Sequence, residues 1–248
     1  MNMPNAGLVL RELSGVAELK HAEWFQKEVW GKDDPPDNSD LMLAIQHEGG
    51  LVAGAFKDGR MLGFLFGFPT SQPHIQHSHR LAVHPDSRGM GLGAKLKWFQ
   101  RDWCLARGIT LVRWTFDPLR RINAGLNIAR LGGSASTYYQ DYYGEMVGIN
   151  AGIPSDRLLV DWHLTAPRVE ALAKGHATAV ADGAGETLTV EVPKDLDRLR
   201  VADLDAAISE RLRVREEMTS AFSQGYKVEG FDTEACCYLL TKADGVAS

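Results

Sequence analysis

The spacing of apolar positions predicts one amphipathic helix followed by a set of adjacent strands in the first third of the chain. Over residues 14–30 the apolar residues recur at helical spacing, and Val16, Leu19, Ala22 and Trp24 fall near one side. A shorter helix and three strand-like runs follow, at residues 41–47, 51–57, 60–68 and 75–83.

The connections between these runs carry specific turn and helix signals. Asp58-Gly59 between the first two strands is typical of a tight β-hairpin. After Pro85 the apolar period changes from two to about 3.6. We therefore expect a helix that Gly108 can end, with an apolar stripe of Leu92, Leu96, Phe99, Trp103 and Ala106.

The middle of the chain continues the alternation of strands and helices. A buried strand is expected at residues 109–116. Asp117-Pro118 then resembles an N-cap followed by a proline in the first helical turn, which predicts a helix to about residue 131. Gly132-Gly133 would end it. Two further strands are expected, a tyrosine-rich one at 137–143 and one at 157–164.

From about Ala166 the composition shifts towards Ala, Gly and Thr, so we divide the chain into 1–165 and a smaller αβ segment, 166–248. In the second segment we expect strands at 187–192, 226–231 and 237–240, and one long helix with Leu204, Ile208, Leu212, Met218 and Phe222 on one side. The predicted fold class is mixed α/β, with an αβα three-layer arrangement.

Composition narrows the class of protein. The chain has 248 residues, 44% hydrophobic and 24% charged, as folded globular proteins do. A net charge of -5 argues against nucleic acid as the main partner. The apolar run 61–68 is too short to span a bilayer, and the first ten residues lack a secretory pattern. The three cysteines form no disulfide framework, so a cytoplasmic location is expected. No metal is expected.

The strongest chemical signal is the turn Arg88-Gly89-Met90-Gly91-Leu92-Gly93, which joins a strand directly to a helix. Glycines let the backbone approach a diphosphate, and the N–H groups at a helix start attract anionic oxygens. A dinucleotide-binding turn would belong to the first strand of a βαβ unit, with an acidic residue about 20 positions on. Neither condition holds here, and the Lys-Ser/Thr pair of a P-loop is absent.

The pattern Leu81-x-Val83-x-Pro85-x-x-Arg88-Gly89-x-Gly91-x-Gly93-x-x-Leu96 resembles the acetyl-CoA signature of GNAT acyltransferases. The resemblance covers about residues 7–164. It implies that an acyl-CoA is the cosubstrate and that the preceding strand pairs with the pantetheine arm. The residues implied are Leu81 and Val83 for the arm, and Arg88, Gly89, Met90, Gly91, Leu92, Gly93 and Ala94 for the phosphates.

A narrower resemblance covers more of the chain. The segments at 114–119, 123–132, 143–144 and 150–157 are similar to a bacterial predicted-acetyltransferase subfamily within GNAT. Some members of that group are linked to N-acylation of amino acids, including with succinyl-CoA. This resemblance implies acetyl-CoA or succinyl-CoA as donor and a small-molecule amine as acceptor.

The candidate base is a pair of histidines on the strand before the turn. A primary amine must lose a proton before it attacks a thioester, and a group that titrates near neutral pH can take that proton. His77 and His79 stand at i and i+2 and share a strand face with Leu81 and Val83. The local sequence His77-Ser78-His79-Arg80-Leu81-Ala82-Val83-His84 is similar to the corresponding strand of arylalkylamine N-acetyltransferases. In those enzymes two histidines relay the amine proton through water. The alternative is two structural, hydrogen-bonded histidines.

A proton donor for the departing thiolate is harder to place. GNAT enzymes commonly use a tyrosine four residues before the glycine that ends the helix after the fifth strand, and here that position is Ile128. Tyr138 and Tyr143 are the remaining candidates for the proton donor. Alternatively, these tyrosines only pack against their neighbours, and solvent supplies the proton. A covalent route through Cys104 is disfavoured because that thiol lies near an apolar helix stripe with no histidine near in sequence.

Three further residues are candidates for ligand contacts. Asn123 and Asn127 stand at i and i+4, and the resemblance implies amide contacts to coenzyme A from that helix face. Arg157 could clamp a carboxylate of an amino-acid acceptor or a succinyl group, or instead form a surface salt bridge after Asp156.

Three functions are compatible with these residues. The leading one is an N-acyltransferase in which the amine attacks the thioester directly in a ternary complex. The others are a non-catalytic acyl-CoA-binding module and a protein N-acetyltransferase. Residues 166–248 could cap the acceptor site, extend the sheet or form a homodimer contact.

Overall fold

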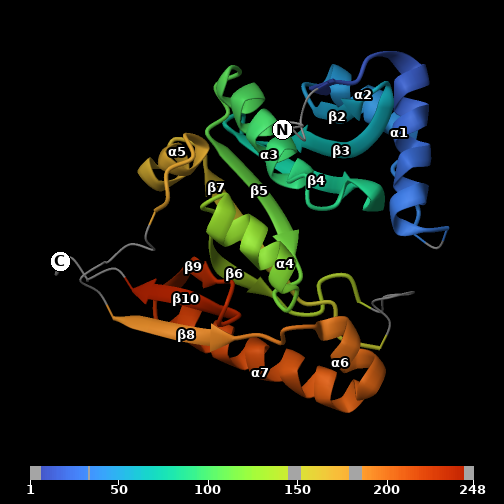
Figure 1. The fold of residues 1–248 in the computed structure, drawn as a ribbon. Helices are drawn as coiled ribbons and strands as arrows, with labels where there is room; N and C mark the ends of the chain where they lie inside the picture. The colour runs from blue at the N-terminus through green and yellow to red at the C-terminus, as the bar shows by residue number, and fades with distance from the viewer. Residues whose placement is uncertain (1–6, 33, 145–151, 179–185, 243–248) are drawn as a thin grey trace, which may run out of the picture. The chain divides into compact units, whose positions relative to one another are not determined.

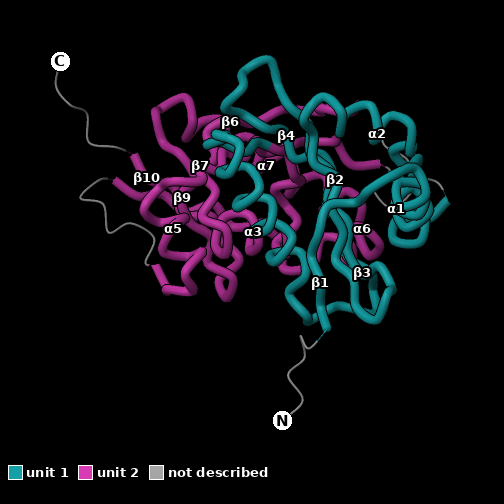
Figure 2. Tube along the Cα trace, turned by 90° about the horizontal axis from the view of Figure 1, so that it is seen from above, with its two compact units in different colours: residues 1–113 teal, residues 114–248 magenta. Residues whose placement is uncertain are grey.

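A computed structural model describes residues 7–32, 34–144, 152–178 and 186–242. Asn150 and Ala151, which belong to a segment interpreted above, lie outside this part. The chain forms two compact units, residues 1–113 and 114–248 (Figure 2), and each is described by itself. The boundary between them falls inside strand β5 (Leu111–Phe116). The functional division predicted at residue 165 stays a prediction.

Unit 1 is built on a sheet of order β1-β2-β3-β4-β5, in which only the β4–β5 pair is parallel. The three predicted strands and the helix at 14–30 are confirmed, and Asp58 and Gly59 adopt the positive φ angles of a tight hairpin, 51° and 77°. The elements are β1 (Leu8–Glu12), α1 (Gly15–Trp30), α2 (Ser39–His47), β2 (Leu51–Lys57), β3 (Arg60–Pro69), β4 (Ile75–Val83), a 3₁₀ turn (Pro85–Ser87) and α3 (Leu92–Leu105).

Helices cover both faces of this sheet (Figure 1). Phe64 and Phe66 on β3 pack into one core with residues of α1 and α2. The preceding residue, Gly63, points to the opposite face, where a Cβ would lie 2.9 Å from Leu96 of α3. Unit 1 therefore has the predicted layer order of helix, sheet and helix.

The predicted apolar side of α1 is partly wrong. Leu19, Ala22 and Phe25 are buried, whereas Val16 and Trp24 are 45% and 56% exposed. The buried residues lie on the side of α1 that includes Phe25, because only one side of an amphipathic helix packs against the sheet.

Strand β4 pairs with its two neighbours over different lengths. With β5, in unit 1, it pairs only from Ile75 to His77. With β3 it pairs from Gln76 to Val83, but the register shifts so that Phe66 faces Arg80 while Gly67 faces Ser78. His79 is thus an extra residue in β4, which is the definition of a β-bulge, and bulges bend strands and redirect side chains.

Unit 2 contains a second run of strands in the order β7-β6-β9-β10-β8. Ala135 of β6 pairs with Val228 of β9, so the strands of residues 166–248 extend the sheet, as one of the three proposed roles required. The elements are α4 (Arg121–Ala124), a π-helical turn η2 (Gly125–Arg130), β6 (Ser134–Tyr139), β7 (Arg157–His163), α5 (Pro167–Ala173), β8 (Thr187–Glu191), α6 (Leu196–Ala202), α7 (Leu204–Ser223), β9 (Tyr226–Asp232) and β10 (Cys237–Lys242).

Two predicted boundaries in unit 2 are wrong. The helix begins at Arg121 and not at Pro118, because the Asp117 carboxylate receives the Leu119 N–H at 2.9 Å and closes a separate turn. The tyrosine-rich strand ends at Tyr139. Asp141 adopts φ 45° in the turn that follows, so a continuous strand to residue 143 is not formed.

The buried side of α7 also differs from the predicted one. Leu204 and Leu212 are 43% and 46% exposed. The buried residues are Ala207, Arg211, Val214, Met218 and Ala221. Arg211 is 2% exposed and donates both terminal nitrogens to Asp117, at 2.7 and 2.8 Å. Arg211 can thus be buried on the inner side of α7 because the carboxylate of Asp117, far away in sequence, pairs with its charge.

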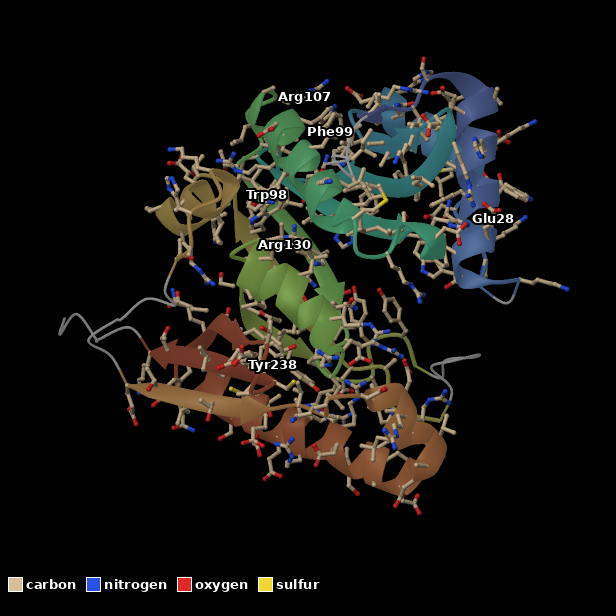
Figure 3. All side chains as sticks on the ribbon, viewed as in Figure 1. Glu28, Trp98, Phe99, Arg107, Arg130 and Tyr238 are labelled. Carbon is tan, nitrogen blue, oxygen red and sulfur yellow. The ribbon has the colours of Figure 1, made fainter. Side chains whose placement is uncertain are left out.

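Strand β10 is tied to the same segment. Tyr238 of β10, labelled in Figure 3, is buried, and its hydroxyl donates to the Pro118 carbonyl at 2.7 Å.

Of the helices that the structure describes, none has both the length and the apolar character needed to cross a membrane.

The Arg211–Asp117 pair gives a test of this packing. Arg211→Ala leaves a largely buried carboxylate without its partner, so we expect a loss of about 3–5 kcal/mol in the free energy of unfolding. The control is Arg213→Ala, which breaks an exposed pair with Glu210 and Glu217; we expect a loss of at most about 1 kcal/mol. Urea denaturation measures both, and equal losses would contradict the buried pairing.

Candidate active site

The turn between β4 and α3 is fixed by main-chain and serine contacts. Ser87 is buried, and its hydroxyl lies 2.8 Å from the His84 carbonyl and 3.2 Å from that of Leu62. Gly89 and Gly91 have φ angles of 83° and 67°, which favour glycine. Helix α3 then begins at Leu92 with no side-chain cap. The predicted order of strand, glycine turn and helix is confirmed.

This turn leaves several N–H groups available. The N–H groups of Arg88 and Met90 donate to Pro85 and Ser87 carbonyls within the turn. In the described part of the chain, no protein acceptor is recorded for the N–H groups of Gly89, Gly91, Leu92, Gly93 and Ala94. The start of an α-helix also carries partial positive charge. The turn therefore has the geometry of an anion-binding site, with the exposed Arg88 beside it.

His77 and His79 come together on one aromatic side chain. The His77 ring stacks on Phe68 with centroids 4.8 Å apart, and His79 lies 5.5 Å from the same ring. The two imidazoles are 6.1 Å apart. His79 Nε2 also lies 3.3 Å from a carboxylate oxygen of Asp37, which in turn contacts Arg80 at 3.1 Å. His77 is thus half-buried and His79 exposed beside the same Phe68 ring, with an acid next to His79.

Asp37 was not predicted as a site residue. It lies in the loop between α1 and α2, 42 positions before His79. The only sequence signal for it was an acidic, proline-containing loop, which is common on protein surfaces.

Burial separates the two histidines chemically. Desolvation, together with the charges of His79 and Lys97, lowers the pKa of His77 from 6.5 to about 4. His77 is therefore neutral near pH 7 and is a weak proton acceptor. This favours His79, which is more exposed and has a carboxylate partner, as the base of the pair.

A buried polar cluster lies behind this part of β4. Lys97 of α3, 2% exposed, donates to Ser78 at 3.0 Å and to Gln100 at 2.8 Å. Gln100 donates to Gln76 at 2.6 Å, and the Cys104 thiol lies 3.3 Å from the same Gln76 oxygen. Ser78 thus links the cluster to the backbone between the two histidines.

The cluster changes the predicted stripe of α3. Leu92, Leu96 and Trp103 are buried as expected, but Ala106 is exposed and Phe99, labelled in Figure 3, is only half-buried. Burial lowers the pKa of Lys97 to about 7 and raises that of Cys104 to about 12. Cys104 is therefore the buried, poorly nucleophilic thiol that the sequence indicated.

The candidate tyrosines lie in unit 2 and differ in their environment. Tyr138 donates its hydroxyl to Asp156 at 2.8 Å, and burial, followed by the charge of Asp156, raises its pKa. Asp156 also receives two hydrogen bonds from Arg215, at 2.6 and 2.8 Å. Tyr143 is 55% exposed and lies 3.5 Å from the Thr115 hydroxyl. Of the two candidates, Tyr143 is the more exposed residue.

Arg157 and the two asparagines are also in unit 2. Arg157 donates to the Asp156 carbonyl at 2.8 Å and lies over the Tyr143 ring. Asn123 is exposed and Asn127 is 6% exposed. Their predicted common face is wrong, because a π-helical turn starts at Gly125 and changes the residue spacing.

Comparison with known proteins agrees with this geometry. Residues 16–124 match the sequence profile of the acetyltransferase (GNAT) family. No match to a curated protein was found. Among solved structures, the ribosomal-protein-S18-alanine N-acetyltransferase from Escherichia coli superposes with a TM-score of 0.53 at 18% identity, covering 63% of this chain and 94% of that one.

Two other acetyltransferases are similar to the same extent. Phosphinothricin acetyltransferase from Sinorhizobium meliloti, in complex with AcCoA, has a TM-score of 0.51 and 16% identity, covering 62% of this chain and 87% of that one. An N-acetyltransferase from Staphylococcus aureus Mu50 has a TM-score of 0.52 and 13% identity, covering 64% and 99%. At these identities the likeness establishes the fold.

Fold, turn and family profile point to one class of protein, the acyl-CoA-dependent acyltransferases of the GNAT type. The profile match covers residues 16–124, less than half of the chain.

The anion-binding turn predicts a selective effect of one glycine. Alanine is strained in the left-handed region by about 1–2 kcal/mol. Gly91→Ala should therefore weaken acetyl-CoA binding about tenfold, because the N–H groups lose their common orientation. The control Gly108→Ala places the same strain, at φ 75°, beyond the other end of α3. Calorimetric titration should show unchanged affinity for this control; equal effects would contradict a role for the turn.

Lys97 predicts a particular pH dependence of stability. Its pKa is lower in the folded protein, about 7, than its ordinary 10.5, so the unfolded chain binds the proton more tightly. The stability of the native protein should then rise as pH increases from 7 to 10.5. Urea denaturation at several pH values should show a smaller rise for Lys97→Met than for the exposed control Lys20→Met. Identical pH slopes in both variants would rule out a depressed lysine.

Proposed function

We propose that this protein transfers an acetyl or succinyl group from its coenzyme A thioester to the primary amine of a small, amino-acid-like acceptor. The observation that carries the proposal is the set of available N–H groups from Gly89 to Ala94 at the start of α3. The anionic oxygens of a diphosphate can accept hydrogen bonds from these N–H groups.

The residues around the turn would hold the coenzyme. Arg88, Gly89, Met90, Gly91, Leu92, Gly93 and Ala94 would bind the diphosphate. Leu81 and Val83 are half-buried on the section of β4 where no β5 partner is recorded within unit 1, so their main chain can pair with the pantetheine amides.

Proton removal from the acceptor would fall to His79. A primary amine with a pKa near 10.4 is a free base in only about one molecule in two thousand at pH 7. Because Asp37 faces Nε2 of His79, the other ring nitrogen, Nδ1, is the one left for the amine or a bridging water. His77 would act as a neutral hydrogen-bonding member of the relay.

The transfer is then a single displacement. The amine nitrogen forms a bond to the thioester carbonyl carbon, the C–S bond breaks, and the amine proton passes to His79. A main-chain N–H of β4 would polarise the carbonyl. Tyr143 would return a proton to the thiolate, in preference to Tyr138, whose hydroxyl hydrogen is held by Asp156. The three thiols are free, which is consistent with a reaction in the cytoplasm.

The base assignment predicts a pH-dependent loss of activity. With acetyl-CoA and a panel of small primary amines, His79→Asn should lower kcat about a hundredfold near neutral pH. The deficit should shrink as pH rises, since the amine then loses its proton to solvent. Asp37→Asn should reproduce a smaller part of the same effect.

The matched control is His74→Asn. His74 lies just before β4 and is exposed, with only its carbonyl in a recorded contact. Release of coenzyme A thiol measures the rate in every variant. Wild-type turnover in His79→Asn at all pH values would contradict the assignment of this base.

A further inference from the structure

Two successive residues of β4, His79 and Arg80, lie on the same side of the unit 1 sheet. His79 Nε2 is 3.3 Å from Oδ1 of Asp37, and Arg80 Nε is 3.1 Å from Oδ2 of the same carboxylate. Neighbouring residues of a regular strand point to opposite faces. The β-bulge at His79 interrupts this alternation, so one carboxylate contacts both side chains.

The same bulge changes which residues share the histidine face. Ala82 belongs to the core that α1 and α2 cover. Arg80, two positions before Ala82, therefore shares the side of His79. The prediction that Leu81 and Val83 lie on this face is wrong, because it assumed unbroken alternation along the strand.

The bulge is held from the opposite side of the sheet. Ser78, the residue before it, accepts a hydrogen bond from Lys97 of α3 at 3.0 Å. Gln100 of the same helix donates to Gln76 at 2.6 Å. Gly67 of β3 leaves room for these two amides, since a Cβ there would lie 3.0 and 3.1 Å from them. Contacts with α3 thus fix the point at which β4 departs from the regular register.

Arg80 links β4 to residues 34–38, which lead from α1 into α2. Its Nη1 donates to Asp34 at 2.9 Å, its Nη2 donates to the Pro35 carbonyl at 3.0 Å, and its Nε faces Asp37. The guanidinium also lies 4.8 Å from the centre of the Trp30 ring. A planar guanidinium can make several directed contacts at once, which the ammonium group of a lysine cannot reproduce.

The side chain of Asp37 depends on this link. Asp37 precedes α2 and belongs to no helix or strand. Its main chain is bound by buried Gln26, which accepts the Asp37 N–H at 3.0 Å and donates to the Asp37 carbonyl at 3.3 Å. Within the described residues, the recorded contacts of its carboxylate are those with His79 and Arg80. The orientation of this carboxylate towards His79 therefore depends on Arg80.

We infer that Arg80 is a positioning residue for the acyl transfer, and that it holds the Asp37 carboxylate against Nε2 of His79. The inference rests on the proposed function, because it requires His79 to take the proton of the acceptor amine. A carboxylate fixed at one imidazole nitrogen sets which nitrogen faces the acceptor, and it stabilises the imidazolium that forms. Arg80 thus acts on proton transfer through Asp37 and contacts neither the acyl-CoA nor the amine.

Steady-state kinetics measure the contribution of Arg80. With acetyl-CoA and a panel of small primary amines, Arg80→Gln should lower kcat about tenfold, as coupled neighbouring residues do. The KM for acetyl-CoA should not change. Arg80→Lys should recover part of kcat, since it keeps a positive charge near Asp37 but loses the directed contacts. Rates are expressed per folded protein, so that a loss of stability is not counted as a loss of kcat.

The matched control is Arg11→Gln in the same unit. Arg11 also joins a strand to α1 and lies over a ring: it forms a bidentate pair with Glu18, at 2.6 and 2.8 Å, and its guanidinium is 4.4 Å from the centre of the Phe56 ring. Strands β2 and β3 separate β1 from β4. This variant should keep the wild-type kcat. Equal losses of kcat in Arg11→Gln and Arg80→Gln would overturn the inference.

Double variants separate positioning from a general structural role. If Arg80 acts through Asp37 and His79, then Arg80→Gln should change kcat by less than about twofold in the His79→Asn background. A loss of about tenfold that persists in this background would show that Arg80 acts independently of His79, and it would overturn the inference.

Amide hydrogen exchange, followed by NMR, tests the contact without turnover. The Asp37 N–H should exchange about tenfold faster in Arg80→Gln than in the wild-type protein, because residues 34–38 lose their link to β4. In Arg11→Gln its exchange rate should not change. Wild-type exchange of this N–H in Arg80→Gln would overturn the inference whether or not an accepted amine is found.

The failure of this inference can be distinguished from the failure of the proposed function. Wild-type kcat in Arg80→Gln, beside a loss of about a hundredfold in His79→Asn, would overturn the inference and leave the proposed base in place. Wild-type kcat in His79→Asn would contradict the proposed base, and the inference with it.

Discussion

The start of helix α3 is the constraint on which the rest of the site depends. An α-helix leaves its first N–H groups without partners inside the helix, and here no side chain caps them. Gly89 and Gly91 allow the left-handed conformations that turn these groups outwards. Buried Ser87 anchors the turn to carbonyls of the preceding strands. The turn is thus held by contacts within the protein itself, and a preorganised site loses little conformational entropy when it binds an anion.

Buried charge recurs beside both sets of candidate residues. In unit 1, Lys97 lies in a cluster of amide, hydroxyl and thiol groups behind the two histidines. In unit 2, Arg211 meets Asp117 and Arg215 meets Asp156 in bidentate pairs. A buried polar group is costly unless its hydrogen bonds are satisfied. Such clusters therefore fix the positions of neighbouring groups, as Asp156 does for the Tyr138 hydroxyl.

The sequence was informative where structure depends on local pattern. Strands β2 to β5, the hairpin at Asp58-Gly59, helix α3 and its glycine turn were all predicted. The errors occur where distant partners decide. Asp117 was predicted to be a helix cap, but its carboxylate accepts hydrogen bonds from Arg211, 94 positions away. Asp37 approaches His79 across 42 positions, and Lys97 is buried because β4 supplies Ser78. A π-helical turn likewise leaves no simple mark in apolar spacing. Roles for Tyr143, Arg157 and the asparagines stay predictions.

Amide NMR shifts during a coenzyme A titration test the central claim most directly, because they observe the N–H groups themselves. If the turn holds the diphosphate, the amide signals of Gly89, Gly91, Leu92, Gly93 and Ala94 should shift together and saturate at one dissociation constant. Adenosine without a diphosphate should leave them nearly unmoved. Saturable coenzyme A binding that leaves these five amides unshifted would contradict the assignment of the turn.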